Sequence, residues 1–377
     1  MSTSEGAAPN GAYILPLRWS EPGPIEELAS YLRSLEGAVR EVLVIDGSPA
    51  SLYESHERAL AGIARYLRPH TDLDFPMGKV NGVITGVREC SCERVVIADD
   101  DVRYDALTLQ RALSLLSDAD LVRPQNYFAE LPWHARWDTA RSLLNRVFTG
   151  DLAFPTGDFP GTLAVRRSSF LRSDAYDGRA LFENLELMRT IRAAGGTVLS
   201  PLDLYVARMP PSTSHFLSQR VRQAYDDFAI PLRMGAFLSA GPLGIKLLRN
   251  GKRRTLALAL STLIGLAEVG RRRAGGAEQF PRSASLLAPA WIAERSVCAW
   301  LALGSKLRGG VRYGGRRLSH SATSMRRLRR RLEADRLVSP VAEGPGLGAT
   351  AAAEGDDLAS HLDLVPFLVD QGERSAD

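Results

Sequence analysis

VVIADDDVRY (residues 95–104) places a short apolar run directly before three consecutive aspartates, Asp99, Asp100 and Asp101. The apolar run predicts a buried strand. Three like charges at the end of such a strand repel one another and are costly to desolvate unless a cation offsets them. Mg²⁺ and Mn²⁺ prefer oxygen ligands and commonly contact substrate phosphates, so the aspartates predict a divalent metal site. The simpler alternative is an acidic turn that caps the next helix.

Strands and helices alternate along the first 230 residues or so. Continuous apolar runs predict strands at 12–17, 41–46, 94–98 and 119–125. Apolar residues at helical spacing predict helices at about 25–35, 52–67, 79–89, 105–116, 180–196 and 215–229. This alternation predicts an α/β fold with a mostly parallel, doubly wound sheet. Ligands of such sheets lie beyond the carboxyl ends of the strands, where Asp46 and the three aspartates both fall.

The charge of the chain is unevenly distributed. The 377 residues include 47 Lys and Arg and 43 Asp and Glu, which gives a formal net charge of +4. Residues 246–332 hold 20 Lys and Arg against three acids, a net charge of +17, so the remainder carries −13. Such a split predicts a polyanionic partner for the basic part.

The composition changes after about residue 233. Two apolar runs, 255–267 and 286–304, are flanked by arginine clusters. Neither reaches the roughly 18–20 uninterrupted apolar residues that a membrane-spanning helix needs. Because Trp291 and Trp300 suit a headgroup boundary, we expect interfacial or re-entrant helices on an anionic membrane. The alternative is a helical subdomain that packs on the sheet and leaves its arginines solvated.

The domain organisation follows from these changes in composition. We expect a disordered tail at 1–11, an α/β domain at 12–233, a basic helical segment at 234–332 and a second disordered tail at 333–377. We expect no secretory signal, because the first eleven residues have neither a basic start nor an apolar run. Cys90, Cys92 and Cys298 cannot form a disulfide framework or a four-cysteine zinc site. We therefore expect a cytoplasmic protein that associates peripherally with the inner face of the plasma membrane.

Seven motifs occur in a defined order along the chain. They are ILP (14–16), VIDGS (44–48), GKVNGVITG (78–86), the three aspartates, GTLAVRRSSF (161–170), FENLELMRTIRAAGG (182–196), and Gln219 with Arg222. In order and spacing they resemble a family 2 glycosyltransferase of the GT-A fold, in the nucleotide-diphospho-sugar transferase superfamily, over about residues 12–230. The resemblance implies a GT-A domain at 12–233 that binds a nucleoside-diphosphate sugar with Mg²⁺ or Mn²⁺.

The resemblance also implies roles for single residues. Asp46 would bind the nucleotide base or ribose, and Lys79 would hold the nucleotide end. Asp99 would meet the ribose or a metal-bound water, with Asp100 beside it in the substrate site. Asp101, together with Asp99, would ligate the metal.

Two of the motifs are only partly matched. Arg222, with Gln219 beside it in the substrate site, would meet the diphosphate, to which a guanidinium can pair bidentately. The Trp that ends the family's Q-x-x-R-W is Gln223 here. The Asn of the family's lysine motif is replaced by Ile84.

The residue that accepts the acceptor's proton is another departure. The family's Glu-Asp pair reads Glu183-Asn184 here, and asparagine cannot accept a proton from a hydroxyl. Glu183 is the expected base, and Glu186, one turn later, is the alternative. A weak or inactive member of the family is a further alternative.

Four more residues are candidates for the site. His215 lies where a late histidine completes the metal coordination in some GT-A enzymes, and imidazole suits Mn²⁺; a surface histidine is the alternative. Trp133 and His134 would cover the sugar or the acceptor, or else belong to a core aromatic cluster. Asp158 is either an acceptor-side residue or a plain turn residue.

Taken together, these patterns predict a metal-dependent, inverting glycosyltransferase. It would move a sugar from a nucleoside-diphosphate sugar to a hydroxyl of a glycan or lipid-linked acceptor at an anionic membrane surface. A sugar nucleotidyltransferase would share the scaffold, but PLRWSEPGP (16–24) lacks the Gly-rich phosphate loop of that class. A non-catalytic protein whose basic segment binds nucleic acid is a third reading. We expect no specific nucleic acid partner, because Trp-bearing apolar helices suit a membrane better.

Overall fold

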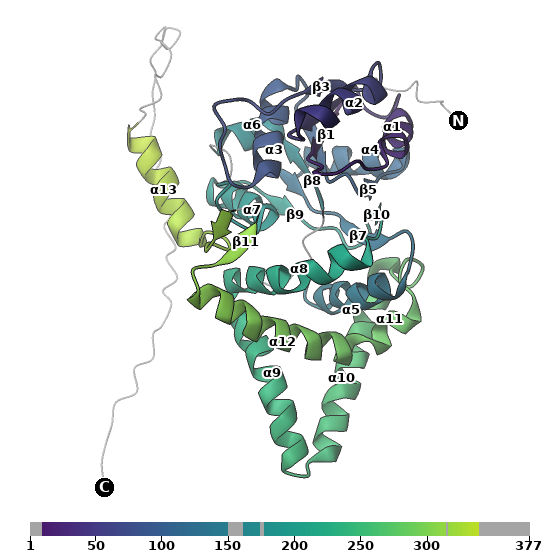
Figure 1. Ribbon diagram of the computed structural model, residues 1–377, viewed down its shortest axis with the longest axis vertical. Coiled ribbons are helices and arrows are strands. Elements are labelled where there is room, and N and C mark those ends of the chain that lie inside the picture. Colours follow the sequence, from purple (N-terminus) through teal and green to yellow (C-terminus); the bar gives the residue numbers. More distant parts are fainter. Residues whose placement is uncertain (1–9, 150–160, 174–176, 314–315, 339–377) are drawn as a thin grey trace, which may run out of the picture. The chain divides into compact units, whose positions relative to one another are not determined.

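The structure of the chain, a computed structural model, describes residues 10–149, 161–173, 177–313 and 316–338 (Figure 1). Asp158, the predicted acceptor-side residue, lies outside the described residues. Contacts divide the chain into a unit that extends to Asp335 and a second unit that begins at Arg336. Of the second unit, only the end of helix α13 (Met325–Val338) is described, and this helix covers the first residues of the tail predicted at 333–377.

A mostly parallel sheet forms the centre of the first unit. In the described part of the chain its strand order is β3-β2-β1-β4-β8-β6-β9. The strands are β1 Ala12–Leu17, β2 Glu41–Asp46, β3 Arg65–Leu67, β4 Arg94–Ala98, β6 Leu121–Val122, β8 Thr162–Arg166 and β9 Val198–Leu199. β8 runs antiparallel to both of its neighbours, and the other pairs are parallel. The predicted α/β class is therefore confirmed, as are the strands predicted at 12–17, 41–46 and 94–98.

A small second sheet begins just after the three aspartates. Its strands are β5 Val102–Arg103, β10 Tyr205–Arg208 and β7 Gln125–Phe128, with β10 in the middle. A hairpin of β11 (Val311–Tyr313) and β12 (Arg316–Leu318) lies shortly before α13. Because β5 leads directly out of the acidic run, this small sheet places Arg208 of β10 beside it.

Helices cover both faces of the central sheet. Those of the α/β part are α1 Ile25–Arg33, α2 Ala50–Leu60, α3 Gly78–Glu89, α4 Ala106–Ser114, α5 Trp133–Val147, α6 Arg167–Arg172, α7 Glu183–Ala193 and α8 Thr213–Tyr225. Alternate residues of β1 enter different cores. Ile14 packs in the core that contains Val83 of α3, and Tyr13 packs in the core that contains Leu28 of α1. Both faces of β1 are therefore buried, as expected for a parallel strand covered on two sides.

Helix α3 lies unusually close to β1 because glycines recur every four residues on one of its sides. A Cβ atom on Gly82 would lie 2.9 Å from Cβ of Pro16, and one on Gly86 would lie 2.5 Å from Cγ2 of Ile14. Residues four apart share one side of a helix, so these glycines face the strand together. Close packing of α3 on β1 is the structural reason for the glycines in GKVNGVITG.

The helix predicted at 52–67 is wrong at its C-terminal end. Helix α2 ends at Leu60, and Gly62 adopts a φ of +74°, which a helix cannot continue through. Residues 65–67 form the edge strand β3, which pairs in parallel with β2. The apolar spacing at residues 63 and 67 fits a helix equally well, so the pattern alone could not locate the break.

Most of the basic segment is helical, although β11 and β12 also fall within residues 234–332 and α13 begins there. Its helices are α9 Pro231–Arg249, α10 Arg253–Arg272, α11 Arg282–Leu286 and α12 Ala288–Leu307. α12 packs against α8 and α9, and α10 packs against α5, so the segment belongs to the same unit as the sheet. The boundary predicted at 233/234 falls inside α9. Among the described helices, none combines the length and the apolar character needed to cross a membrane.

Replacing Gly86 by alanine tests the close packing of α3. We expect the free energy of unfolding to fall by about 1–3 kcal/mol, because the added methyl overlaps Ile14 and the core must shift. Urea unfolding of the purified parent and variant measures this change in the free energy of unfolding. The control is Gly265→Ala in α10, where a Cβ meets nothing within 4 Å and alanine should stabilise the helix by up to about 1 kcal/mol. Equal effects of the two substitutions would contradict the packing described here.

Candidate active site

A polar pocket lies beyond the carboxyl end of β4. Asp99, directly after β4, and residues from α5, β10, α7 and α8 meet there with residues of the basic segment. Its charged lining residues are Asp99, Arg141, Glu183, Arg208, Arg222, Asp226, Asp227, Arg233 and Arg295, and Asn184, Gln223, Phe237 and Trp291 also line it. Asp99, Glu183 and Arg222, three of the residues predicted for the site, are thus brought together from distant parts of the sequence.

Lys79, at the start of α3, joins two carboxylates at the edge of this pocket. Its Nζ lies 2.6 Å from Oδ1 of Asp99 and 3.0 Å from Oε1 of Glu183. Burial raises the pKa of Asp99 above its ordinary value, although Lys79 opposes the rise. Burial would also raise the pKa of Glu183, but here Lys79 prevails and holds that pKa below its ordinary value. Glu183 is therefore ionised at neutral pH.

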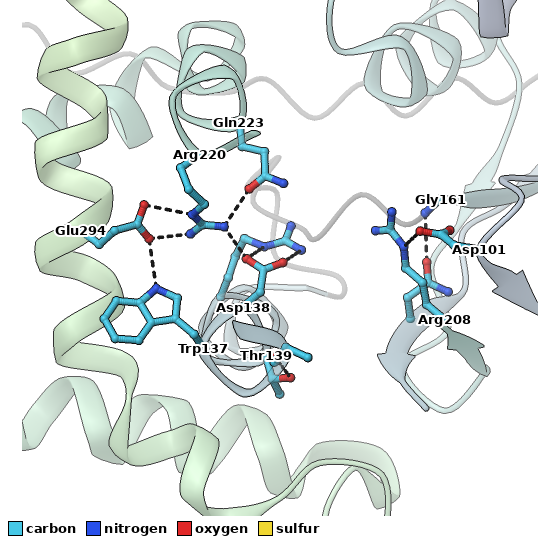
Figure 2. Close-up of polar contacts among 12 residues, drawn as sticks. Asp101, Trp137, Asp138, Thr139, Gly161, Arg208, Arg220, Gln223 and Glu294 are labelled. Carbon is cyan, nitrogen blue, oxygen red and sulfur yellow. Dashed lines mark hydrogen bonds and ion pairs between the residues drawn. The ribbon is translucent and has the colours of Figure 1, made fainter. Parts of the chain in front are cut away.

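Asp101 faces a second cation, Arg208 of β10. Its Oδ2 accepts a hydrogen bond of 2.7 Å from Nε of Arg208 (Figure 2). Burial opposes the charge on Arg208, but Asp101 and Asp99 raise its pKa. The other carboxylate oxygen of Asp101, Oδ1, is buried and has no hydrogen-bond partner among the described residues. Asp101 thus keeps one acceptor available for a ligand.

Asp99 and Asp101 fit a divalent metal ion. Mg²⁺ is commonly held by one or two carboxylates and completes its shell with water and substrate phosphates. The buried, unpartnered Oδ1 of Asp101 is the acceptor that such an ion would satisfy. Within the described ranges, no group of three or more His, Cys, Asp or Glu is arranged to hold a metal. His215 is exposed at the start of α8 and is not brought to the two aspartates, so the surface alternative describes its position.

Asp46 lies beneath the surface rather than in the pocket. It is fully buried at the end of β2, and its carboxylate accepts hydrogen bonds from the Ser48 amide at 2.7 Å and from the Tyr66 hydroxyl at 2.6 Å. Its Oδ2 also lies 2.7 Å from Nδ1 of His56. These hydrogen bonds lower the pKa of Asp46 although burial opposes them. The structure does not bring Asp46 to the lining of the pocket.

Trp19 links this buried group to the acidic run. Its ring packs edge-on against His56, with ring centroids 5.1 Å apart. Its indole Nε1 donates a hydrogen bond to Oδ2 of Asp100. Asp100 is therefore held by a residue from the segment after β1, and no pattern in the sequence singled that residue out.

Arg222 of α8 is the predicted diphosphate-binding residue, and it lines the pocket. Its Nε donates to Oε1 of Gln219, one turn earlier, so Gln219 orients the guanidinium. The guanidinium lies 5.7 Å from the ring centroid of Tyr313 in β11. Residues near 313, outside the predicted α/β domain, therefore border the site.

The two candidate bases lie in different environments. Glu183 lines the pocket at the start of α7, next to Asn184. Glu186 is fully buried, and its Oε2 accepts a hydrogen bond of 2.6 Å from the Thr323 amide. The structure does not bring Glu186 into the pocket, because its side chain points toward the segment around residue 323.

Trp133 and His134 form an aromatic cluster with Phe216 of α8. His134 is buried, its Nε2 lies 2.8 Å from the Pro211 carbonyl, and its ring stacks at 5.4 Å on Phe216. Trp133 packs edge-on against both rings and remains about half exposed. Neither residue lines the pocket, so the arrangement corresponds to the aromatic-cluster alternative.

Arg220 anchors the basic segment to the α/β part. Its guanidinium donates to both oxygens of Glu294 in α12, to Asp138 of α5 and to Gln223 of its own helix (Figure 2). Trp137 also donates to Glu294. A buried arginine with this many acceptors is fully paired, and it fixes three helices to one another.

Two consecutive aspartates after α8 are site residues that the sequence reading missed. Asp227 pairs with Arg233 at 2.6 Å. Asp226 lines the same pocket, and its buried Oδ1 has no partner in the described part of the chain. Burial raises the pKa of Asp226 to about 7, and the charges of Glu183 and Asp227 add to the rise. The only signal in the sequence was the Asp-Asp pair directly after the Q-x-x-R helix.

Comparison with known proteins finds only distant similarity, to solved structures. No family model matches the chain, and no curated protein matches it. A mannosyltransferase of Pyrobaculum calidifontis, solved with GDP-mannose and Mn²⁺, is 18% identical over 89% of this chain and 82% of its own, with a TM-score of 0.44. Glucosyl-3-phosphoglycerate synthase of Mycobacterium tuberculosis, solved with Mn²⁺, UDP and phosphoglyceric acid, is 18% identical over 55% of this chain and 73% of its own, with a TM-score of 0.39.

Replacing Asp226 by asparagine tests the protonation of this carboxyl. Below about pH 7 the folded chain keeps the carboxyl of Asp226 protonated, whereas the unfolded chain releases that proton near pH 4. The free energy of unfolding of the parent therefore falls as the pH rises from about 4 to about 7. We expect Asp226→Asn to gain stability relative to the parent over that range and to show a constant gain above it. Urea unfolding between pH 4.5 and 8.5 measures the difference. A difference that does not change with pH would contradict the assignment.

Proposed function

We propose that this chain is a metal-dependent glycosyltransferase that uses a nucleoside-diphosphate sugar. The observation that carries the proposal is the meeting of Asp99, Glu183 and Arg222 in one pocket at the carboxyl end of β4. These residues come from three separate motifs and are up to 123 positions apart. A pocket of this kind, at strand ends and with groups of shifted pKa, is the usual place for a site in an open α/β sheet.

The chain's own residues suit the chemistry of glycosyl transfer. Asp99 and Asp101 would hold Mg²⁺ or Mn²⁺, which neutralises negative charge on a leaving diphosphate. Arg222 presents a guanidinium, oriented by Gln219, to the same diphosphate. Lys79 keeps Asp99 and Glu183 together while adding one positive charge.

Glu183 is the proposed proton acceptor. It is ionised and borders the pocket, whereas Asn184 has no basic oxygen and Glu186 is buried elsewhere. The acceptor hydroxyl gives its proton to Glu183, and its oxygen forms a bond to the anomeric carbon. The bond from that carbon to the diphosphate breaks, and the diphosphate leaves with the electron pair. Attack from the face opposite the leaving group inverts the anomeric configuration.

We also propose that the hairpin of α9 and α10 docks the protein on an anionic membrane. Figure 1 shows the two helices meeting at residues 250–252, away from the sheet. Several large apolar side chains on the hairpin are exposed: Leu243, Ile245, Leu248, Leu258 and Leu260. Basic residues surround its tip: Lys246, Arg249, Lys252, Arg253 and Arg254. Exposed apolar residues beside a basic cluster suit the interface of a bilayer that contains anionic lipids.

Nucleotide binding with and without metal tests the proposed reaction. We expect UDP, GDP or dTDP to stabilise the chain only with Mn²⁺ present, by about 2.7 kcal/mol when the ligand is at about 100 times its Kd. Asp101→Asn should lose this stabilisation, and Asp118→Asn, an exposed control, should keep it. Glu183→Gln should keep nucleotide binding while transfer falls by about 10²- to 10⁴-fold. Full transfer activity in Glu183→Gln would rule out the base assignment, and release of pyrophosphate would indicate a nucleotidyltransferase.

Vesicle sedimentation tests the proposed docking. We expect the chain to bind phosphatidylglycerol vesicles more tightly than phosphatidylcholine vesicles or generic DNA. Changing Leu258 and Leu260 together to Glu should weaken vesicle binding at least about tenfold, since burying one leucine is worth about 1.5–3 kcal/mol. Leu107→Glu in α4, where the side chain is 80% exposed, is the matched control and should bind as the parent does. Unchanged binding of the double variant would overturn the assignment of this surface.

A further inference from the structure

Four buried N–H groups that line the pocket have no hydrogen-bond partner among the described residues. They are Nε and Nη1 of Arg295, Nε of Arg233 and Nε1 of Trp291. Buried donors are nearly always paired in folded proteins. The described lining of the same pocket also has two unpartnered carboxylate oxygens, Oδ1 of Asp226 and Oδ2 of Asp227, but neither forms a hydrogen bond with these donors. Four unpartnered donors along one pocket therefore indicate a missing acceptor. We take these three residues together as the inner donor cluster.

Arg295 is the centre of the inner donor cluster. Its side chain is 4% exposed, and the nearest carboxylate oxygen, Oδ2 of Asp227, lies 3.9 Å from Nη1, beyond hydrogen-bond distance. The other oxygen of Asp227 already pairs with Arg233 at 2.6 Å. One carboxylate thus serves two guanidinium groups, and its contact with Arg295 is a long ion pair without a hydrogen bond. The ring centroids of Trp291 and Phe237 lie 5.2 and 5.9 Å from its guanidinium carbon. The positive charges of Arg220 and Arg141 also act on Arg295, and the negative charge of Glu294 opposes them.

Arg220 shows what a purely structural arginine looks like in the same region. It is as deeply buried as Arg295, and its guanidinium donates to two carboxylates and one amide oxygen. Arg295 has the same burial without these acceptors. A buried guanidinium that lacks a hydrogen-bonded counter-charge is costly to the folded chain, so its retention calls for another role.

The chemistry of the inner donor cluster selects an oxyanion. Water could satisfy single N–H groups but would leave the charge of Arg295 uncompensated. A phosphate or carboxylate supplies both several acceptors and the negative charge, and the planar guanidinium matches its geometry. A neutral sugar hydroxyl supplies an acceptor but no negative charge.

We propose that the inner donor cluster is a binding subsite for a phosphate or carboxylate group carried by the acceptor. The proposal rests on the proposed function, because the subsite lies in the same pocket as Asp99 and Glu183. An anionic group held by Arg295 would orient the acceptor with its reacting oxygen toward Glu183. The acceptor is then a phosphorylated or carboxylated molecule, either water-soluble or lipid-borne.

Phosphate binding in the presence of saturating nucleoside diphosphate and Mn²⁺ tests the subsite. The probes are inorganic phosphate, glycerol 3-phosphate and short-chain phosphatidic acid, and the readouts are calorimetry and urea unfolding. We expect saturable binding in the parent and at least a tenfold loss of affinity in Arg295→Met. Arg295→Lys keeps the positive charge but not the planar, two-pronged donor geometry of a guanidinium. Its affinity for phosphate should lie between those of the parent and Arg295→Met. Arg58→Gln, at an exposed position of α2 away from the pocket and the hairpin, is the control and should bind as the parent does.

The stability of the unliganded variants separates a binding role from a structural one. Without phosphate, Arg295→Met should be at least as stable as the parent, because it removes an unpaired buried charge. A less stable Arg295→Met with unchanged phosphate affinity would overturn the subsite. Binding of the lipid probe alone would identify a lipid-borne anion, and binding of glycerol 3-phosphate a soluble one; both outcomes support the subsite. If phosphate does not bind while nucleotide still stabilises the chain, only the subsite proposal is wrong. If nucleotide does not bind, the proposed function is wrong.

Discussion

A single ammonium group holds the candidate site together. Nζ of Lys79 contacts Asp99 after β4 and Glu183 at the start of α7, and these three residues come from three different elements. Without that cation, two buried carboxylates would face each other across the pocket, and burial would favour their protonation. Lys79 therefore keeps Glu183, the proposed base, ionised and holds it next to Asp99, a proposed metal ligand.

The remaining charges of the pocket differ in how fully they are paired. Asp101 pairs with Arg208, and Asp227 pairs with Arg233, so these four groups largely neutralise one another. Each of these pairs nevertheless leaves an atom without a hydrogen-bond partner among the described residues: Oδ1 of Asp101, Oδ2 of Asp227 and Nε of Arg233. Asp226 and Arg295 have unpartnered atoms in the pocket as well and form no close ion pair with any described residue. Pairing therefore stabilises the walls of the pocket, and the atoms that remain unpartnered are those that we propose to contact ligands.

The sequence alone was sufficient to predict the frame of the molecule. Continuous apolar runs located β1, β2 and β4, and the aspartates after β4 lie at the strand end where a ligand site was expected. The pattern could not show that His56 and Tyr66 would bury the carboxylate of Asp46, since both residues read as ordinary members of neighbouring elements. It could not single out Arg295 among twenty basic residues either, because only the packing of α12 on α8 makes that side chain buried and unpaired.

The glycine side of α3 has a consequence for electrostatics as well as for packing. Lys79 lies in the first turn of this helix, and Gly82 contacts β1 one turn later. Because protein interiors are close-packed, a side chain larger than hydrogen at 82 must displace either Pro16 or the first turn of α3, and a shift of that turn would move the ammonium of Lys79. The affinity of the pocket for anions is thus coupled to the volume of a residue that never touches a ligand. A core substitution in this helix can therefore change the electrostatic potential of the pocket even where it leaves the free energy of unfolding unchanged.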